Sequence, residues 1–282
     1  SLGSVYAIIA LGYTMVYGIA KMLNFAHGDV IMIGGYVLFS MIYGSGTNVF
    51  AALIVAMVVC TVLGVVIEKV AYKPLREASS LAVLITAIGV SILLQNIAQL
   101  IFTSQPKMFR NPIKLGSVKM FGANIEGSTI LMIVLGIIIV VALSIFIRKT
   151  KTGRAMLAVS EDKDAAKLMG INVNTTITIT FAIGSALAAL ASLLMFNAYP
   201  SLIPTSGSMP GIKAFVAAVF GGIGSIPGAM VGGIVLGIIE VLSGAYIPNG
   251  TKLANAIVFV VLIVVLIFKP TGLFGKKIKE KV

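Results

Sequence analysis

Seven stretches of this 282-residue chain are apolar over about 20 residues each, and they leave few folds open to it. A bilayer core about 30 Å thick is crossed by about 20 residues of helix. Inside lipid, each backbone amide must be satisfied within its own segment, which favours helices. The pattern therefore predicts membrane-spanning helices over residues 4–20, 49–71, 80–103, 128–148, 175–197, 226–247 and 251–268.

Two weaker stretches add to this count. Residues 24–43 carry Asn24, His27 and Asp29 before an apolar run, and residues 210–224 are short and glycine-rich. The second stretch is typical of a half-helix or re-entrant segment. We therefore expect an all-α polytopic membrane protein with eight to nine membrane segments. Residues 1–275 would form a single membrane-embedded domain, and residues 276–282 a basic cytoplasmic tail.

Composition excludes several other classes of protein. Apolar residues make up 59% of the chain, charged residues 11%, and the mean hydropathy is +1.09. Soluble domains hold about 25% charged residues, so a soluble enzyme is excluded. Cys60 is the single cysteine, which excludes a disulfide scaffold, and with His27, the single histidine, it cannot supply the four ligands of a structural zinc site. We expect no metal site and no catalytic residues.

The net charge is +12, and the basic residues that produce it lie between the apolar stretches. This distribution indicates how the chain is oriented in a membrane and does not indicate nucleic-acid binding. Basic residues gather in three regions that we expect on the cytoplasmic side: 69–76, 148–167 and 269–281. Residues 104–127 would form a hairpin loop on the opposite side, although this loop also holds four basic residues. Three clear helices separate the last two cytoplasmic regions, so 210–224 must also enter the membrane to bring both to one side.

An internal repeat is a weaker prediction. Residues 28–38 recur in outline as residues 228–236, each following a Gly-Ile pair with a nearby lysine. Internal repeats are common in transporters, where the substrate route runs between them. Gly and Val are frequent in this chain, so chance is an open alternative to two distantly similar halves.

Loop 149–172 has the signals of a short helix over 161–169. Ser160 is a suitable N-cap, Glu161 and Asp162 fall in the first turn, and Gly170 stands at the usual C-terminal glycine position. Nine residues of isolated helix are marginal in water, so this helix needs a surface to dock on. That surface belongs either to the membrane domain or to a partner. Ala165 and Ala166 would offer a shallow face to it.

The sequence Asp164-Ala165-Ala166-x-x-x-Gly170 resembles the Glu-Ala-Ala-x-x-x-Gly motif in the coupling loop of ABC importer permeases, with Asp in place of Glu. From Leu2 to Gly272 the chain is similar to LivH-type permeases of branched-chain amino acid importers. The similarity is carried by Asn24-Phe-Ala-His-Gly-Asp29, Met32-Ile-Gly34, Glu161-Asp162, Gly170-Ile-Asn172, Lys213-Ala-Phe215 and Gly221-Gly-Ile-Gly-Ser-Ile-Pro-Gly-Ala229.

This resemblance implies a non-catalytic permease subunit in the cytoplasmic (inner) membrane. Its partners would be a second related permease subunit, two ATP-binding subunits and an extracytoplasmic amino-acid-binding protein. Residues Ser160, Glu161, Asp162, Asp164, Ala165, Ala166 and Gly170 would form the helix that couples to the ATPase. ATP and Mg²⁺ would be bound by the partner subunits, because this chain has no phosphate-binding loop of the form Gly-x-x-x-x-Gly-Lys-[Ser/Thr].

Ionisable residues at membrane depth face protein or water. Asn24, His27 and Asp29 either cap a broken helix start, or lie beside the translocation path or a junction of helices. Glu240 either pairs with a lysine near the cytoplasmic end or faces a water-filled cavity. Glu68, beside Lys69 at a helix end, would extend to the membrane surface.

Glycines in the last third of the chain predict close helix packing, because small residues let backbones approach. That packing is either within the subunit or against a second permease subunit around a central pore. The residues are Gly224, Gly228, Gly232, Gly233 and Gly237.

Three functions are open to a chain with these features. The first is half of an importer's permease for branched-chain or other apolar amino acids, with related permeases for urea or short amides as an alternative substrate class. The second is an ion-coupled secondary transporter, for which Asp29 and Glu240 are the candidate carboxylates. The third, an intramembrane enzyme, lacks a His-Glu-x-x-His motif or an evident Ser/His pair.

Overall fold

The computed structural model describes residues 2–110, 116–120, 123–247 and 250–275, and most of them are helical. Six helical segments in this described part are long and apolar enough to cross a membrane. They are α1 (Leu2–Ala20), α3 (Val49–Ile67, continued by short helical turns to Leu75), α4 (Ser80–Phe102), α5 (Gly127–Lys149), α8 (Val173–Ala198) and α10 (Ile226–Tyr246).

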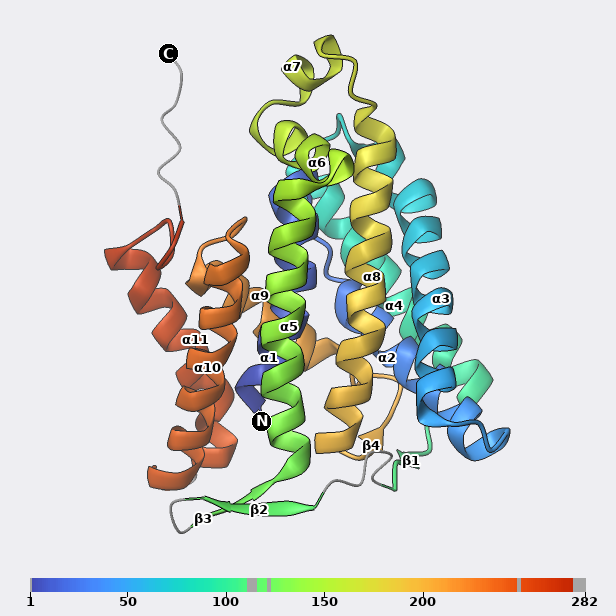
Figure 1. The fold of residues 1–282 in the computed structure, drawn as a ribbon, viewed down its shortest axis with the longest axis vertical. Coiled ribbons are helices and arrows are strands. Elements are labelled where there is room, and N and C mark those ends of the chain that lie inside the picture. The colour runs from blue at the N-terminus through green and yellow to red at the C-terminus, as the bar shows by residue number, and fades with distance from the viewer. Residues whose placement is uncertain (1, 111–115, 121–122, 248–249, 276–282) are drawn as a thin grey trace.

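Helix α1 lies at the centre of the bundle, behind α5 in Figure 1. It packs against α8, α9 (Ser208–Gly221) and α10 and is buried along almost its whole length. By contrast, α3, α4 and α5 each present a largely apolar outer face, typical of helices in lipid.

Two shorter helices meet inside the bundle. Helix α2 (His27–Phe39) follows a non-helical stretch over 21–26, and Lys21, at its start, has a φ of 57°. Helix α9 follows the short strand β4 (Ser201–Leu202). A methyl group added at Gly207 or Gly211 would overlap the backbone at Gly28, so the beginnings of α9 and α2 lie in direct backbone contact.

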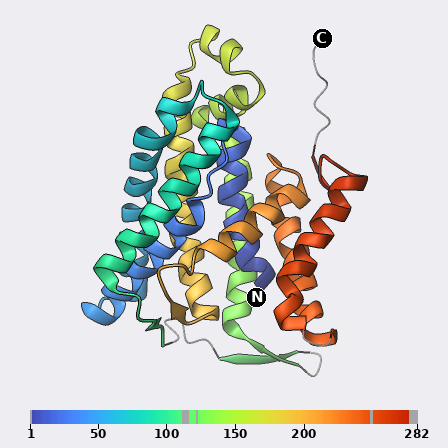
Figure 2. The same ribbon diagram turned by 180° about the vertical axis from the view of Figure 1, so that it is seen from behind.

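The molecule has two distinct ends. The α3–α4 connection, helices α6 (Lys151–Glu161) and α7 (Lys163–Leu168), and the end of α11 (Gly250–Phe268) lie toward one end, as Figures 1 and 2 show. The strands lie at the other end: β1 (Lys107–Met108) pairs with β4, and β2 (Ser117–Met120) pairs with β3 (Ala123–Glu126), both antiparallel. The described parts of the three basic regions thus share one end.

Several sequence predictions need revision. The all-α prediction left out the two small sheets. They form in residues 104–127 and 201–202, which lie outside the long apolar stretches. Residues 24–43 hold the 13-residue helix α2, which continues as a π-helical turn over Ser40–Gly44. The eight-to-nine segment count and the two similar halves stay predictions. The predicted basic tail, 276–282, lies outside the described residues.

Candidate functional site: a docking surface at helices α6 and α7

Helix α6 is fixed to the end of α5. Thr150 is its N-cap, and its hydroxyl accepts a hydrogen bond from the Gly153 amide at 2.9 Å. Gly153 is buried against Phe146 and Ile147 of α5, where a methyl group would overlap the backbone. Met156 and Val159 are buried on the same helix. The chain therefore turns sharply after α5, and α6 lies against the membrane bundle.

Helix α7 (Lys163–Leu168) confirms a short helix in this loop, but it begins two residues later and ends one residue earlier than the predicted 161–169, and Ser160 is not its N-cap. The N-cap is Asp162, whose carboxylate accepts hydrogen bonds from the amides of Asp164 and Ala165 at 2.9 and 3.0 Å. Ser160 instead lies inside α6, where its hydroxyl donates to the Leu157 carbonyl. A carboxylate at the N-cap also interacts favourably with the helix dipole, which explains why Asp162 starts the helix.

Gly170 ends α7, as the sequence predicts. Gly170 has a φ of 80°, a left-handed conformation that glycine adopts without steric cost. The Ile171 amide donates to the Ala166 carbonyl at 3.0 Å, which closes the last turn. The chain then enters α8, capped by Asn172, whose side chain accepts from the Thr175 amide.

The outer surface of α7 is more apolar than the sequence indicated. Ala165 is exposed, but Ala166 is buried against this chain, so the two alanines do not share one docking face. Leu168 and Met169 are 89% and 82% exposed at the tip of the molecule. Asp164 and Lys167 flank them with an exposed ion pair of 3.4 Å. We call Asp164, Ala165, Lys167, Leu168 and Met169 the α7 tip.

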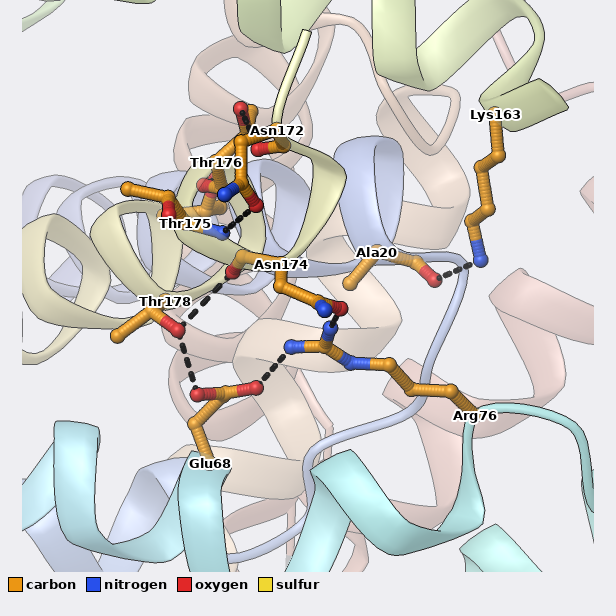
Figure 3. Close-up of polar contacts among 10 residues, drawn as sticks. Ala20, Glu68, Arg76, Lys163, Asn172, Asn174, Thr175, Thr176 and Thr178 are labelled. Atoms are coloured by element: carbon orange, nitrogen blue, oxygen red, sulfur yellow. Dashed lines mark hydrogen bonds and ion pairs between the residues drawn. The ribbon is translucent and has the colours of Figure 1, made fainter. Parts of the chain in front are cut away.

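A lysine connects α7 directly to the central helix. The Lys163 ammonium donates a hydrogen bond to the carbonyl of Ala20, the last residue of α1, at 3.0 Å (Figure 3). A cation is favourable at a helix C-terminus, where carbonyls lack helical partners. Partial burial, together with the positive charges of Arg76, Lys21 and Lys167, lowers the pKa of Lys163, while Asp164 opposes this shift.

A second polar cluster joins the end of α3, the α3–α4 connection and α8 at the same end. Glu68, at the end of α3, is fully buried; it forms an ion pair with Arg76 and accepts a hydrogen bond from the Thr178 hydroxyl of α8 at 2.7 Å. Arg76 also donates to Asn174 (Figure 3). The prediction that Glu68 extends to the membrane surface is therefore wrong, because an arginine eight residues later pairs with it inside the protein.

The polar residues before and within α2 do not cap it. The N-cap is Ala26, without a side-chain hydrogen bond. Asn24 accepts from the Tyr72 hydroxyl at 3.0 Å, and the His27 ring packs edge-on to Tyr13. Asp29 accepts from the Gln95 amide of α4 at 3.0 Å, and that amide also donates to Ser208 of α9. These three residues thus lie at contacts of α2 with α1, α4, α9 and the end of α3.

Glu240 pairs with a lysine, as one of the two predicted alternatives has it, but this lysine lies within the bundle and not near the cytoplasmic end. The Lys213 ammonium of α9 lies 2.6 Å from one carboxylate oxygen, and the Tyr6 hydroxyl of α1 donates to the other at 2.9 Å. The Lys213 side chain is buried and that of Glu240 nearly so. This ion pair links the three helices α1, α9 and α10 within the bundle.

The predicted packing glycines lie mostly on α10. A methyl group at Gly228 or Gly232 would overlap the carbonyls of Gly221 and Ala217 of α9, and one at Gly233 or Gly237 would overlap the backbone of α1. Gly224 precedes α10 with a φ of 91° and has room for a methyl group. Four of the five glycines therefore allow close helix contact within this subunit.

Comparison with known proteins identifies the family of this chain. A family model described as "Branched-chain amino acid transport system / permease component" matches residues 1–266. Over 294 aligned residues the chain is 45% identical to the high-affinity branched-chain amino acid transport system permease protein LivH of Salmonella typhimurium and 42% identical to BraD of Pseudomonas aeruginosa. Both alignments cover all of this chain and 95% of the relative. The solved structure of PsaBC from Streptococcus pneumoniae in complex with Fab aligns with 96% of this chain and 91% of its own, with 15% identity and a TM-score of 0.48.

The chain therefore belongs to the permease component family of branched-chain amino acid transport systems. It is a multi-pass membrane permease of the ABC importer class, and the resemblance seen in the sequence is confirmed.

Proposed function

We propose that this chain is a non-catalytic subunit that forms half of the uptake pathway for branched-chain or other apolar amino acids. ATP hydrolysis in two partner subunits, which bind the ATP and Mg²⁺, drives the transport. A second, related permease subunit completes the pathway in the cytoplasmic membrane, and an extracytoplasmic amino-acid-binding protein delivers the substrate. The names of the relatives, at 42–45% identity over the whole chain, support this substrate class.

The α7 tip is the single observation that carries the coupling role. Leu168 and Met169 are almost fully exposed beyond the end of the bundle, at the end where the basic loops gather. Exposed apolar side chains rimmed by charges mark surfaces that bind protein. The local hydrogen bonds of Asp162 and Gly170 hold this apolar surface in a fixed shape, so a partner groove can bind it without first ordering it.

The contact of Lys163 with Ala20 supports a route from the α7 tip to the membrane. Movement of α7 would pull on the end of α1, and residues 21–26 connect that end to α2. ATP binding favours one arrangement of the ATPase subunits, and through this contact it would favour one arrangement of α1 and α2.

We also propose that α2 and α9 each fill one crossing together with the non-helical stretch before them. With both included, the direction of the chain agrees with the basic regions lying at one end, which supports nine crossings. Discontinuous helices that meet near the middle of a bundle are typical of transport sites. Asn24, His27 and Asp29 would then lie next to the translocation path.

An ion-coupled secondary transporter is disfavoured by the partners of its candidate carboxylates. Glu240 is neutralised by Lys213 and hydrogen-bonded to Tyr6, so it is not free to bind a coupling ion. Asp29 then stands as the single candidate, and it already accepts a hydrogen bond from Gln95.

Reconstitution into liposomes tests the proposal. The tagged chain, purified with its companions, is expected to bring two ATP-hydrolysing subunits and to take up leucine, isoleucine and valine when ATP and the binding protein are supplied. Urea and acetamide serve as competing substrates. Uptake by the chain alone, driven by a proton or sodium gradient and indifferent to ATP, would overturn the proposal, as would competition by urea with none by leucine.

A further inference from the structure

Helix α4 differs from the other outer helices in what it exposes. Its buried face consists of Val83, Ala87, Leu94 and Ala98. With about 3.6 residues per turn, the opposite face carries Ile85, Gly89, Ile92, Asn96 and Gln99. Gly89, Asn96 and Gln99 are all exposed, and α4 lies on the side of the molecule seen in Figure 2, next to α9. The outer face of this helix is largely apolar, but it also carries a glycine and two amides.

The corresponding faces of α3 and α5 are apolar. Their exposed residues include Val58 and Val62 on α3 and Ile133 and Ile137 on α5. Within the described residues of the six spans, Asn96 is the exposed amide side chain that lies more than one turn from a helix end, and Gln99 is exposed in the last turn of α4. A primary amide in contact with lipid tails has no hydrogen-bond partner for its second N–H or its carbonyl, which is unfavourable.

Among the described residues, the Asn96 amide has one hydrogen-bond partner. Its Nδ2 donates to the Ile92 carbonyl one turn earlier at 2.8 Å, which uses one of its donors. The side chain is otherwise exposed. An amide is both donor and acceptor, so a polar helix face of a similar protein could complete its hydrogen bonds.

Gly89 provides a second, independent observation. A methyl group added there would meet no atom of this chain within 4 Å, unlike at the glycines of α10. Intrachain packing therefore does not require glycine at this position, and glycine is unfavourable in a helix interior. A small residue on an exposed face of a membrane helix lets a second helix approach closely.

The flank of the same helix contacts the two short helices. Gln95 donates to Asp29 of α2 and to Ser208 of α9, both at 3.0 Å. The exposed amides therefore lie one residue or one turn away from the junction at which α2 and α9 meet. A partner bound to the outer face of α4 would lie beside that junction.

We infer that the face of α4 formed by Gly89, Asn96 and Gln99 binds the second permease subunit, with the translocation path next to it at the α2–α9 junction. The partner would present a membrane helix with hydrogen-bonding side chains opposite Asn96 and Gln99. This inference rests on the proposed function, because it requires a second permease in the assembly.

Site-specific photocrosslinking in the intact assembly tests the contact. A benzophenone amino acid placed at 96 or 99 is expected to form an adduct whose mass spectrum identifies the second permease subunit. The same probe at Val62 or Ile137, which lie on the exposed faces of α3 and α5, is expected to give no such adduct.

A substitution at Gly89 separates assembly from folding. Gly89→Leu has open space in this chain, so the chain should reach the membrane at the normal level, while the second permease is lost from the purified assembly. Val62→Leu is the matched control and should retain the second permease.

If the second permease stays with the Gly89→Leu variant, or if probes at 96 and 99 react only with lipid, the inference is overturned. If that happens while the assembly still contains the ATP-hydrolysing subunits and still takes up substrate with ATP, the proposed function stands. If the wild-type assembly lacks the ATP-hydrolysing subunits and ATP-driven uptake, the proposed function itself is overturned.

Discussion

Two buried carboxylates in this protein are each held by a cation and by a hydroxyl group distant in sequence. Glu240 pairs with Lys213 and accepts from Tyr6, and Glu68 pairs with Arg76 and accepts from Thr178. Loss of one member leaves the other charge buried without compensation, which costs more than the pair itself contributes. The two clusters therefore fix helix positions: the first joins α1, α9 and α10, and the second joins the ends of α3 and α8.

Lys213→Met is expected to destabilise the protein by about 3 kcal/mol, because Glu240 would keep its charge without a cation. The double variant Lys213→Met with Glu240→Gln should recover most of this loss. Thermal unfolding of the detergent-purified protein measures both. Equal stability of the single variant and the wild type would show that this ion pair does not hold the three helices together.

Helix α7 shows how a few local hydrogen bonds define a short helix. Asp162 supplies the two acceptors at its start, and Gly170 ends it in a left-handed conformation. Six helical residues are too few to be stable alone, so these bonds and the burial of Ala166 hold the α7 tip in place.

Asp162→Ala should cost about 1 kcal/mol of local helix stability, as expected for the loss of an N-cap. Ser160→Ala, two residues earlier, should have no such effect, because its hydroxyl lies inside α6. Hydrogen–deuterium exchange of residues 163–168 measures the difference. Equal exchange in the two variants would contradict the assignment of Asp162 as the cap.

Lys163→Met is expected to keep the ATP-hydrolysing subunits bound but to reduce transport per ATP hydrolysed, since the contact with Ala20 is lost while the α7 tip is intact. Lys151→Met is the matched control, because Lys151 is exposed at the start of α6 and lies outside the α7 tip. Uptake and ATP hydrolysis are measured on the same proteoliposomes. An unchanged ratio in Lys163→Met would rule out this contact as the route to α1.

At the level of elements, local sequence predicts what is decided locally. The long apolar runs predict α1, α3, α4, α5, α8 and α10 because about 20 apolar residues have few alternatives to crossing the bilayer. The first residue of α7 was harder to predict from the sequence, because Ser160 and Asp162 are both good N-cap residues. The hydroxyl partners of Glu68 and Glu240 could not be predicted, because Thr178 and Tyr6 are 110 and 234 residues away.

As a whole molecule, the protein is a membrane bundle with one protruding, partly apolar tip. The α7 tip lies at one end, Lys163 connects it to the central α1, and residues 21–26 lead from α1 to the junction of α2 with α9. The outer face of α4 lies beside this junction. In the proposed function, energy from partner subunits would enter at the tip, and the substrate would pass along the bundle.

Copurification of the Ala165→Arg variant tests the central claim, that the α7 tip docks on the ATP-hydrolysing subunits. Ala165 is exposed, so the variant should fold and insert normally, but a long cation in the docking surface should remove those subunits from the purified assembly and abolish uptake. Ala165→Ser, small and polar at the same position, should retain both. Full recovery of the ATP-hydrolysing subunits and normal uptake in Ala165→Arg would contradict the account.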